Sequence, residues 1–186
     1  MSTKSSIKNL LHLSIPIFFA NLAIPLVAIV DTGLMGNLDD ASYLTATSIA
    51  SGLFSMIFWS FGFLRMGTVG MAAQAYGSSQ YNEIADLVIR NITFVIIISL
   101  LLILLQRFVF NLGIQIFDLS NDTEKYFKDY FDIRIYSSFG ELTIYVITGL
   151  FIGLQKTKIS SVVVGFFSVT NIIFSLFFVL YFKLNV

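Results

Sequence analysis

The chain has few of the residues on which many protein functions depend. Its 186 residues include no cysteine, one histidine, two prolines and one tryptophan, and only 12% are charged. Without cysteine there are no disulfides, thiol nucleophiles or thiolate metal sites. The sequence contains no Gly-Lys-Thr/Ser phosphate loop and no metal-ligand spacing. These absences argue against an enzyme and against a resident metal or organic cofactor.

Charge of either sign is also sparse, whereas apolar residues are abundant. Eleven basic and eleven acidic side chains give a net charge of zero, so nothing indicates a nucleic-acid partner. Hydrophobic residues make up 56% of the chain, phenylalanine alone occurs 20 times, and the mean hydropathy is +0.86. Soluble domains have roughly 25% charged residues. The composition therefore predicts an all-α integral membrane protein whose first partner is the lipid bilayer.

Five apolar stretches are long enough to cross a bilayer as helices, which takes roughly 20 residues. They lie near residues 9–34, 44–75, 91–112, 132–155 and 159–182. The connections between them, including 76–90 and 113–131, are expected to be short polar loops. We therefore predict one transmembrane unit over residues 1–186 with no soluble domain.

The N-terminal segment and the loop charges set the expected orientation. Residues 1–8 are polar, and the apolar run that follows is too long for a signal-peptide core, although a cleaved signal is an alternative. Lys4, Lys8, Arg90, Lys156 and Lys158 would face inside if the N-terminus is inside, a weak positive-inside bias. We predict a multi-pass protein of the inner (plasma) membrane with a cytoplasmic N-terminus.

Asp31 closes a run of 22 residues, Asn9 to Val30, that contains no Asp, Glu, Lys or Arg. An acid within a membrane helix is costly and commonly serves ions or substrates. A helix rises about 1.5 Å per residue, so Asp31 could equally be an interfacial acid at the end of a straight helix. Pro16 and Pro25 in the same span predict a bend, either a static kink or a helix that changes shape.

Polar residues recur every seven positions in the fourth span, at Arg134, Glu141, Thr148 and Gln155, with Tyr145 one turn after Glu141. This spacing places them near one face. The stripe either bonds to neighbouring helices or lines a water-filled cavity. In the same span, Gly149 and Gly153 form a small-xxx-small pair, which predicts close helix packing.

Asn171 and Ser175 share one face of the fifth span because they are four residues apart. Such residues in membrane helices commonly hydrogen-bond a neighbouring helix or their own backbone. A role in ion binding is the alternative.

The segment Phe61-Gly62-Phe63-Leu64-Arg65-Met66-Gly67-Thr68-Val69-Gly70-Met71-Ala72-Ala73-Gln74-Ala75-Tyr76-Gly77 closely resembles the second-helix motif of the multidrug and toxic compound extrusion (MATE) family, most of all its DinF-like branch. Pro16-Ile17, the segment Asp31-Thr32-Gly33-Leu34-Met35-Gly36 and the stretch from Arg134 to Thr157 match the same branch in order. The resemblance covers essentially the whole chain.

This resemblance implies an antiporter that uses inward flow of protons or sodium ions to export organic cations, drugs or related amphiphiles by alternating access. It implies two lobes of six helices each, a coupling role for the acid matched by Asp31, and a helix bend at Pro16. With one carboxylate and few other oxygen ligands, we expect protons rather than sodium ions.

Two departures from the family pattern limit what the resemblance implies. Asn171 matches a family asparagine, but Ser175 stands where the family often has aspartate. Glu141 stands where the branch has an uncharged residue, and we hypothesise that it partly replaces the missing acid. Tyr145, Thr148 and Gln155 are then expected to line the cavity.

The chain also stops where the family would enter its sixth helix, so we expect an N-terminal portion that requires the remaining C-terminal helices. Two alternatives stay open. One is a flippase for lipid-linked precursors, for which only Arg65 and Arg134 could serve as cavity cations. The other is a non-transporting membrane remnant or subunit.

Overall fold

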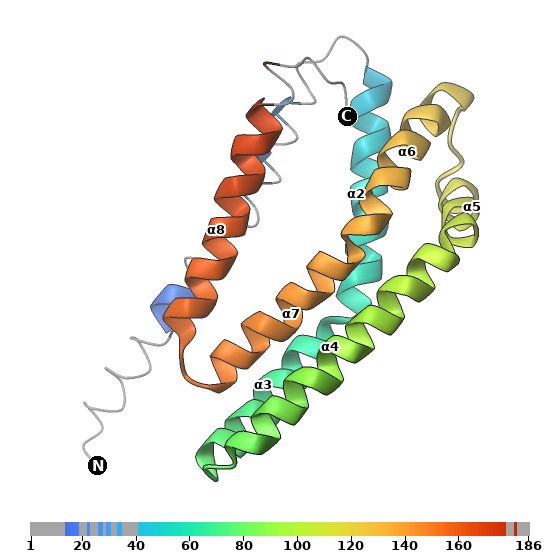
Figure 1. The fold of residues 1–186 in the computed structure, drawn as a ribbon. Helices are drawn as coiled ribbons and strands as arrows, with labels where there is room; N and C mark the ends of the chain where they lie inside the picture. The colour runs from blue at the N-terminus through green and yellow to red at the C-terminus, as the bar shows by residue number, and fades with distance from the viewer. Residues whose placement is uncertain are drawn as a thin grey trace.

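A computed structural model describes residues 14–18, 22, 26, 27, 29, 30, 33, 34, 41–177 and 181 of the chain. Throughout this part of the chain every regular element is a helix (Figure 1). Four helical stretches are long and apolar enough to span a membrane: Ser42–Gly77, Tyr81–Leu104, Thr123–Gly153 and Thr157–Leu176. The predicted class, an all-α integral membrane protein, is confirmed. The expected span at 9–34 lies largely outside the described residues.

Two of these stretches are broken helical runs. The first run consists of α2 and α3 with a break at Phe61, and the second consists of α6 and α7 joined by the short 3₁₀ helix η1. Antiparallel α4 and the shorter α5 connect them, and α8 follows α7. The elements are α2 (Ala41–Ser60), α3 (Gly62–Gly77), α4 (Tyr81–Leu104), α5 (Gln106–Phe117), α6 (Asn121–Arg134), η1 (Ile135–Ser137), α7 (Ser138–Gly153) and α8 (Thr157–Leu176).

The two broken runs lie side by side and point in the same direction, with α2 against α6 and α3 against α7 (Figure 1). Their breaks are also neighbours. The guanidinium carbon of Arg134, the last residue of α6, lies 5.8 Å from the centre of the Phe58 ring, just before the break at Phe61. Both helical runs are therefore interrupted at the same level of the bundle.

Aromatic rings fill the half of the bundle formed by α2, α5 and α6. Phe131 is 1% exposed, and its ring centre lies 5.2 Å from that of Phe54 and 5.5 Å from that of Phe110. Phe127, one turn before Phe131, is fully buried beside Phe110. Tilted and edge-to-face pairs of this kind are the geometry that aromatic side chains prefer.

Small residues form the other half, between α3 and α7. A Cβ atom added to Gly149 would lie 2.8 Å from the carbonyl oxygen of Arg65, and one added to Gly153 would lie 2.7 Å from both the carbonyl oxygen of Val69 and the Cβ of Ala72. The backbones approach this closely because neither glycine has a side chain. The close packing predicted from the Gly149–Gly153 pair is confirmed.

Two helices begin earlier than the apolar runs indicated. We expected loops at 76–90 and 113–131, but α4 starts at Tyr81 and α6 already at Asn121. The prediction of these two loops was wrong. The first turns of both helices are amphipathic, so their polar residues hid the helical pattern. Along α6 and into η1, buried residues recur at intervals of four: Thr123, Phe127, Phe131 and Ile135. Charged residues occupy the opposite face.

Helix α8 packs less extensively than the other spans. It leaves α7 through a tight turn, and its first turns contact α7 through the buried residues Thr157 and Ser160. Farther along, the two helices diverge in Figure 1. Large apolar side chains of α8, among them Phe166, Phe167 and Ile173, are more than half exposed within the described part of the protein. This apolar surface suits contact with lipid or with further helices.

Candidate functional site

The clearest polar site lies where α6 ends and α7 begins. The Ser137 hydroxyl donates a 2.7 Å hydrogen bond to the Arg134 carbonyl oxygen and accepts a 2.9 Å bond from Nη1 of the same residue. A serine that bonds the backbone three residues earlier competes with the regular helical pattern. This local chemistry accompanies the 3₁₀ turn at Ile135–Ser137.

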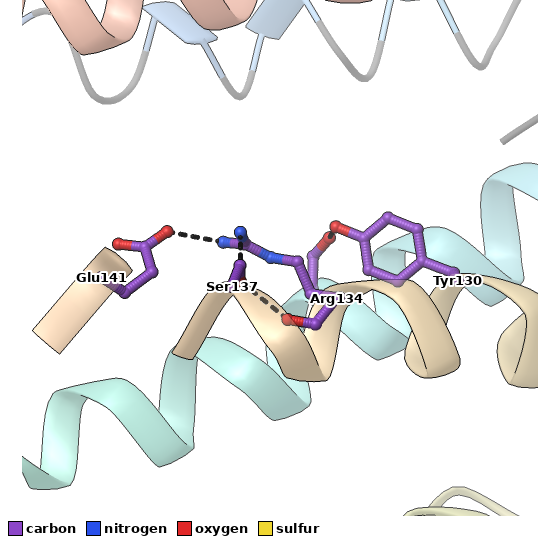
Figure 2. A network of polar contacts seen from close by, with 5 residues as sticks. Tyr130, Arg134, Ser137 and Glu141 are labelled. Carbon is purple, nitrogen blue, oxygen red and sulfur yellow. Dashed lines mark hydrogen bonds and ion pairs between the residues drawn. The ribbon is translucent and has the colours of Figure 1, made fainter. Parts of the chain in front are cut away.

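Across this turn Arg134 forms an ion pair with Glu141. Nη2 of Arg134 donates to Oε1 of Glu141 at 2.8 Å, and Figure 2 shows both side chains leaving the helical run on the same side. The two side chains are 34% and 33% exposed. The face of the Phe58 ring provides a third contact for the guanidinium. Arg134, Ser137 and Glu141 are called the junction cluster below.

Tyr145 extends the cluster by one turn. Its phenol is partly buried and packs against the hydrophobic core. On the other side, one turn before Arg134, the hydroxyls of Tyr130 and Ser51 are 3.1 Å apart, which ties α6 to α2. Polar contacts thus link both helical runs at the level of their breaks.

The four polar residues that recur every seven positions do not form one continuous stripe in the structure. Arg134 and Glu141 bond to each other. The first alternative from the sequence, a structural stripe, had each of them bonding to a neighbouring helix. Thr148 is 2% exposed and donates to the carbonyl oxygen of Ile144, and Gln155 lies exposed in the α7–α8 turn with φ of 60°. Two cavities among the described residues, one beside Gln74 and Arg90 and one beside Arg107 and Lys128, are lined by other side chains. Cavity lining by Tyr145, Thr148 and Gln155 stays a prediction.

The remaining predicted residues are distributed over both ends of the chain. Pro16 is helical and partly buried within 14–18, whereas Pro25 and Asp31 lie outside the described residues. Asn171 is exposed and Ser175 partly buried on α8. Counted along the chain from Gln155, Glu141 lies 14 residues before it and Asn171 lies 16 residues after it. The coupling and bending roles of these residues stay predictions.

Two contributors to the junction cluster escaped the sequence analysis. Ser137 was detectable, because a serine three residues after Arg134 can bond its carbonyl oxygen. Phe58 was not, because its contact with Arg134 joins residues 76 positions apart. A contact between two spans cannot be derived from the periodicity of either one.

Within its described residues, the fold and the junction cluster define an all-helical, multi-pass membrane protein with an ion pair across the break in one of two paired helical runs. A sequence model of the MatE family matches residues 16–177, and the chain therefore belongs to the MatE family.

A particular relative covers nearly the same length of this chain. The chain is similar to the DNA damage-inducible protein F of Escherichia coli (strain K12), with 29% identity over 182 residues. The alignment includes 98% of this chain and 40% of the relative. The chain thus spans about two fifths of the length of that protein. No solved structure matched the chain.

Proposed function

We propose that this chain is the N-terminal portion of a MATE-type antiporter of the inner (plasma) membrane, with its N-terminus in the cytoplasm. The complete exporter would expel organic cations, drugs or related amphiphiles by alternating access, driven by protons rather than sodium ions. Membership of the MatE family over residues 16–177 is the observation that supports this function most directly. The C-terminal helices of the exporter are the partner that the chain requires.

Asp31 and the junction cluster have different parts in this proposal. Asp31 is the acid that exchanges the coupling proton, because it adjoins an apolar run of 22 residues where an unpaired charge is costly. Glu141 is a second acid. During the cycle its carboxylate releases Arg134 and takes up a proton. Its side chain is one-third exposed, so the packed helices of this chain do not enclose it.

The level of the junction cluster also supports an exchange with α8. Glu141 and Asn171 are almost equally distant from the α7–α8 turn, and the two helices diverge above that turn (Figure 1). Closing this hairpin would bring Asn171 and Ser175 toward the ion pair. An amide and a hydroxyl could then bind a protonated Glu141 after Arg134 has been released.

The test is proton-driven efflux by the exporter that contains this chain. We expect Asp31→Asn to abolish proton-driven uptake of a fluorescent organic cation into inverted vesicles, which corresponds to efflux from the cell, while the protein still inserts at normal levels. Asp118→Asn is the matched control, because Asp118 is an exposed turn residue with φ of 47°, which asparagine tolerates. Efflux at the normal rate in Asp31→Asn would refute the coupling role.

The part assigned to Glu141 has its own readout. Glu141→Gln keeps the shape of the side chain and removes its titration, so we expect the pH profile of efflux to change. A fixed profile with a lowered rate would instead make Glu141 a structural partner of Arg134. Sodium dependence is measured in the same vesicles, and efflux that needs sodium at constant pH would contradict proton coupling.

The lipid-precursor flippase receives less support from the site. Export of a pyrophosphate-linked lipid requires cations that are available to the substrate. Arg134 is engaged by Glu141, Ser137 and Phe58, and Arg65 is partly buried in the packed α3 helix. A transport assay with a lipid-linked pyrophosphate separates this alternative from the drug exporter.

A further inference from the structure

A second polar site lies between α5 and α6, away from the junction cluster. Its volume is about 670 Å³, and its wall includes two cations, Arg107 of α5 and Lys128 of α6. The amides of Gln106 and Asn111 and the carboxylate of Asp132 complete its polar lining. Among residues 41–177, none of these five side chains has a hydrogen-bond or ion-pair partner. Such a group of unengaged polar side chains is available to a ligand.

The floor of this pocket is aromatic. Phe110 and Phe131 line it, and their rings are in edge-to-face contact at 5.5 Å. Tyr136, which is 61% exposed, lies at the α6–α7 side of the pocket. The pocket therefore combines a cationic wall with an apolar surface. This combination fits a ligand that has an anionic head and a hydrocarbon part.

The position of α5 indicates where that ligand comes from. Helix α4 has 24 residues and is about 36 Å long, slightly more than the roughly 30 Å hydrocarbon core of a bilayer. Helix α5 follows directly and is amphipathic. Phe108, Leu112 and Ile116 form an exposed apolar stripe at intervals of four residues, and Arg107 and Asn111 lie beside it. A helix of this pattern lies at the interface between lipid tails and headgroups.

We propose that this pocket binds the headgroup of an anionic phospholipid. Arg107 and Lys128 hold the phosphodiester, Gln106 and Asn111 donate to its oxygens, and the acyl chains follow the stripe on α5. With Asp132, the three charged side chains sum to +1, which one phosphodiester neutralises. Basic pockets between transmembrane helices bind lipid headgroups of this class on the cytoplasmic side of membranes, and the same charge complementarity applies at the outer face, where a cytoplasmic N-terminus would place this pocket.

The proposal is tested by lipid binding to the purified exporter that contains this chain in neutral detergent, followed by native mass spectrometry. The probes are phosphatidylglycerol, phosphatidylcholine with the same acyl chains, and glycerol 3-phosphate. Each basic side chain near a membrane surface contributes about fivefold to binding of an anionic lipid. We therefore expect Arg107→Gln/Lys128→Gln to bind phosphatidylglycerol about 25-fold more weakly.

Lys156→Gln/Lys158→Gln is the matched control, because it removes the same charge from exposed positions near the α7–α8 turn. Its affinity for phosphatidylglycerol should stay within about twofold of the unmodified chain. Asp132→Asn should increase the affinity two- to fivefold, because it raises the charge of the site to +2. This second variant tests the site independently of the double variant. Far-UV circular dichroism verifies that every variant keeps its helices.

Any of the following results would overturn the proposal. The first is unchanged phosphatidylglycerol binding in Arg107→Gln/Lys128→Gln, or an equal loss in the lysine control. The second is equal affinity for phosphatidylcholine, which would make the site an acyl-chain groove only. The third is displacement by glycerol 3-phosphate at similar concentration, which would identify a soluble phosphate as the ligand. A loss of affinity in Asp132→Asn would likewise contradict the charge argument.

Discussion

The two halves of the paired helical runs are held together by opposite means. Between α2 and α6 the helices are kept apart by large rings such as Phe54 and Phe131, whereas between α3 and α7 they touch through Gly149 and Gly153. Inside a bilayer the lipid is as apolar as the protein interior, so packing contacts matter more than transfer from water. At an aromatic contact the rings can rearrange. A contact between two backbones contains no side chain that could move. The α3–α7 half is therefore the more rigid pair.

The largest loss of stability is expected where α3 and α7 pack most closely. Gly153→Leu places a side chain where a Cβ alone would approach Ala72 and Val69 to 2.7 Å, so α3 and α7 must separate. We expect a loss of about 3 kcal/mol in the free energy of unfolding, measured by sodium dodecyl sulfate titration in mixed micelles. At Gly140 in the same helix an added Cβ would meet nothing within 4 Å, so Gly140→Leu should not destabilise the protein.

A smaller loss is expected in the aromatic half. Phe131→Ala removes a ring that is 1% exposed, but the neighbouring rings can partly fill the space. The transfer term is small in lipid, so the cost comes mainly from the cavity and the lost contacts, about 2 kcal/mol. Phe108→Ala, at a ring that is 61% exposed, serves as the control and should change stability little. If Phe131→Ala costs more than Gly153→Leu, the contrast between the halves is reversed.

The junction between the halves should respond more weakly. Arg134→Gln breaks the 2.8 Å ion pair, but both partners are about one-third exposed, which limits the loss to about 1 kcal/mol. In a double-mutant cycle, adding Glu141→Gln should recover part of the loss, since two neutral amides no longer leave one charge unpaired. Additive losses would show that the ion pair does not couple the two residues.

The smallest effect has the opposite sign. Ser138, the first residue of α7, is fully buried, and its hydroxyl has no hydrogen-bond partner among the described residues. Ser138→Ala removes this unsatisfied group and should stabilise the protein by about 0.5 kcal/mol. Thr68→Val is the comparison, because the Thr68 hydroxyl donates to Leu64 and accepts from Asn91 at 2.8 Å. That variant should cost about 1 kcal/mol, and a loss in Ser138→Ala would reveal a partner for Ser138.

The sequence predicted the helical class and the close contact at Gly149 and Gly153, because apolar length and small-residue spacing act locally along one helix. It did not predict α6 from Asn121, because the charged face of its first turns concealed the buried interval Thr123, Phe127 and Phe131. It placed Arg134 and Glu141 near one face but did not predict that they bond to each other. The 3₁₀ turn that lets them bond depends on Ser137, whose effect is specific to one hydroxyl position.

The side-by-side arrangement of the two helical runs also determines the order in which the protein can assemble. Thr68 and Gly149 touch, yet 81 positions separate them in the chain. Ribosomes add about 5–20 residues per second, so the second surface follows the first by several seconds. During that interval the face of α3 that later meets Gly149 and Gly153 has no α7 against it. The contact between α3 and α7 can form only after α7 has been made, which makes it a late step in biogenesis.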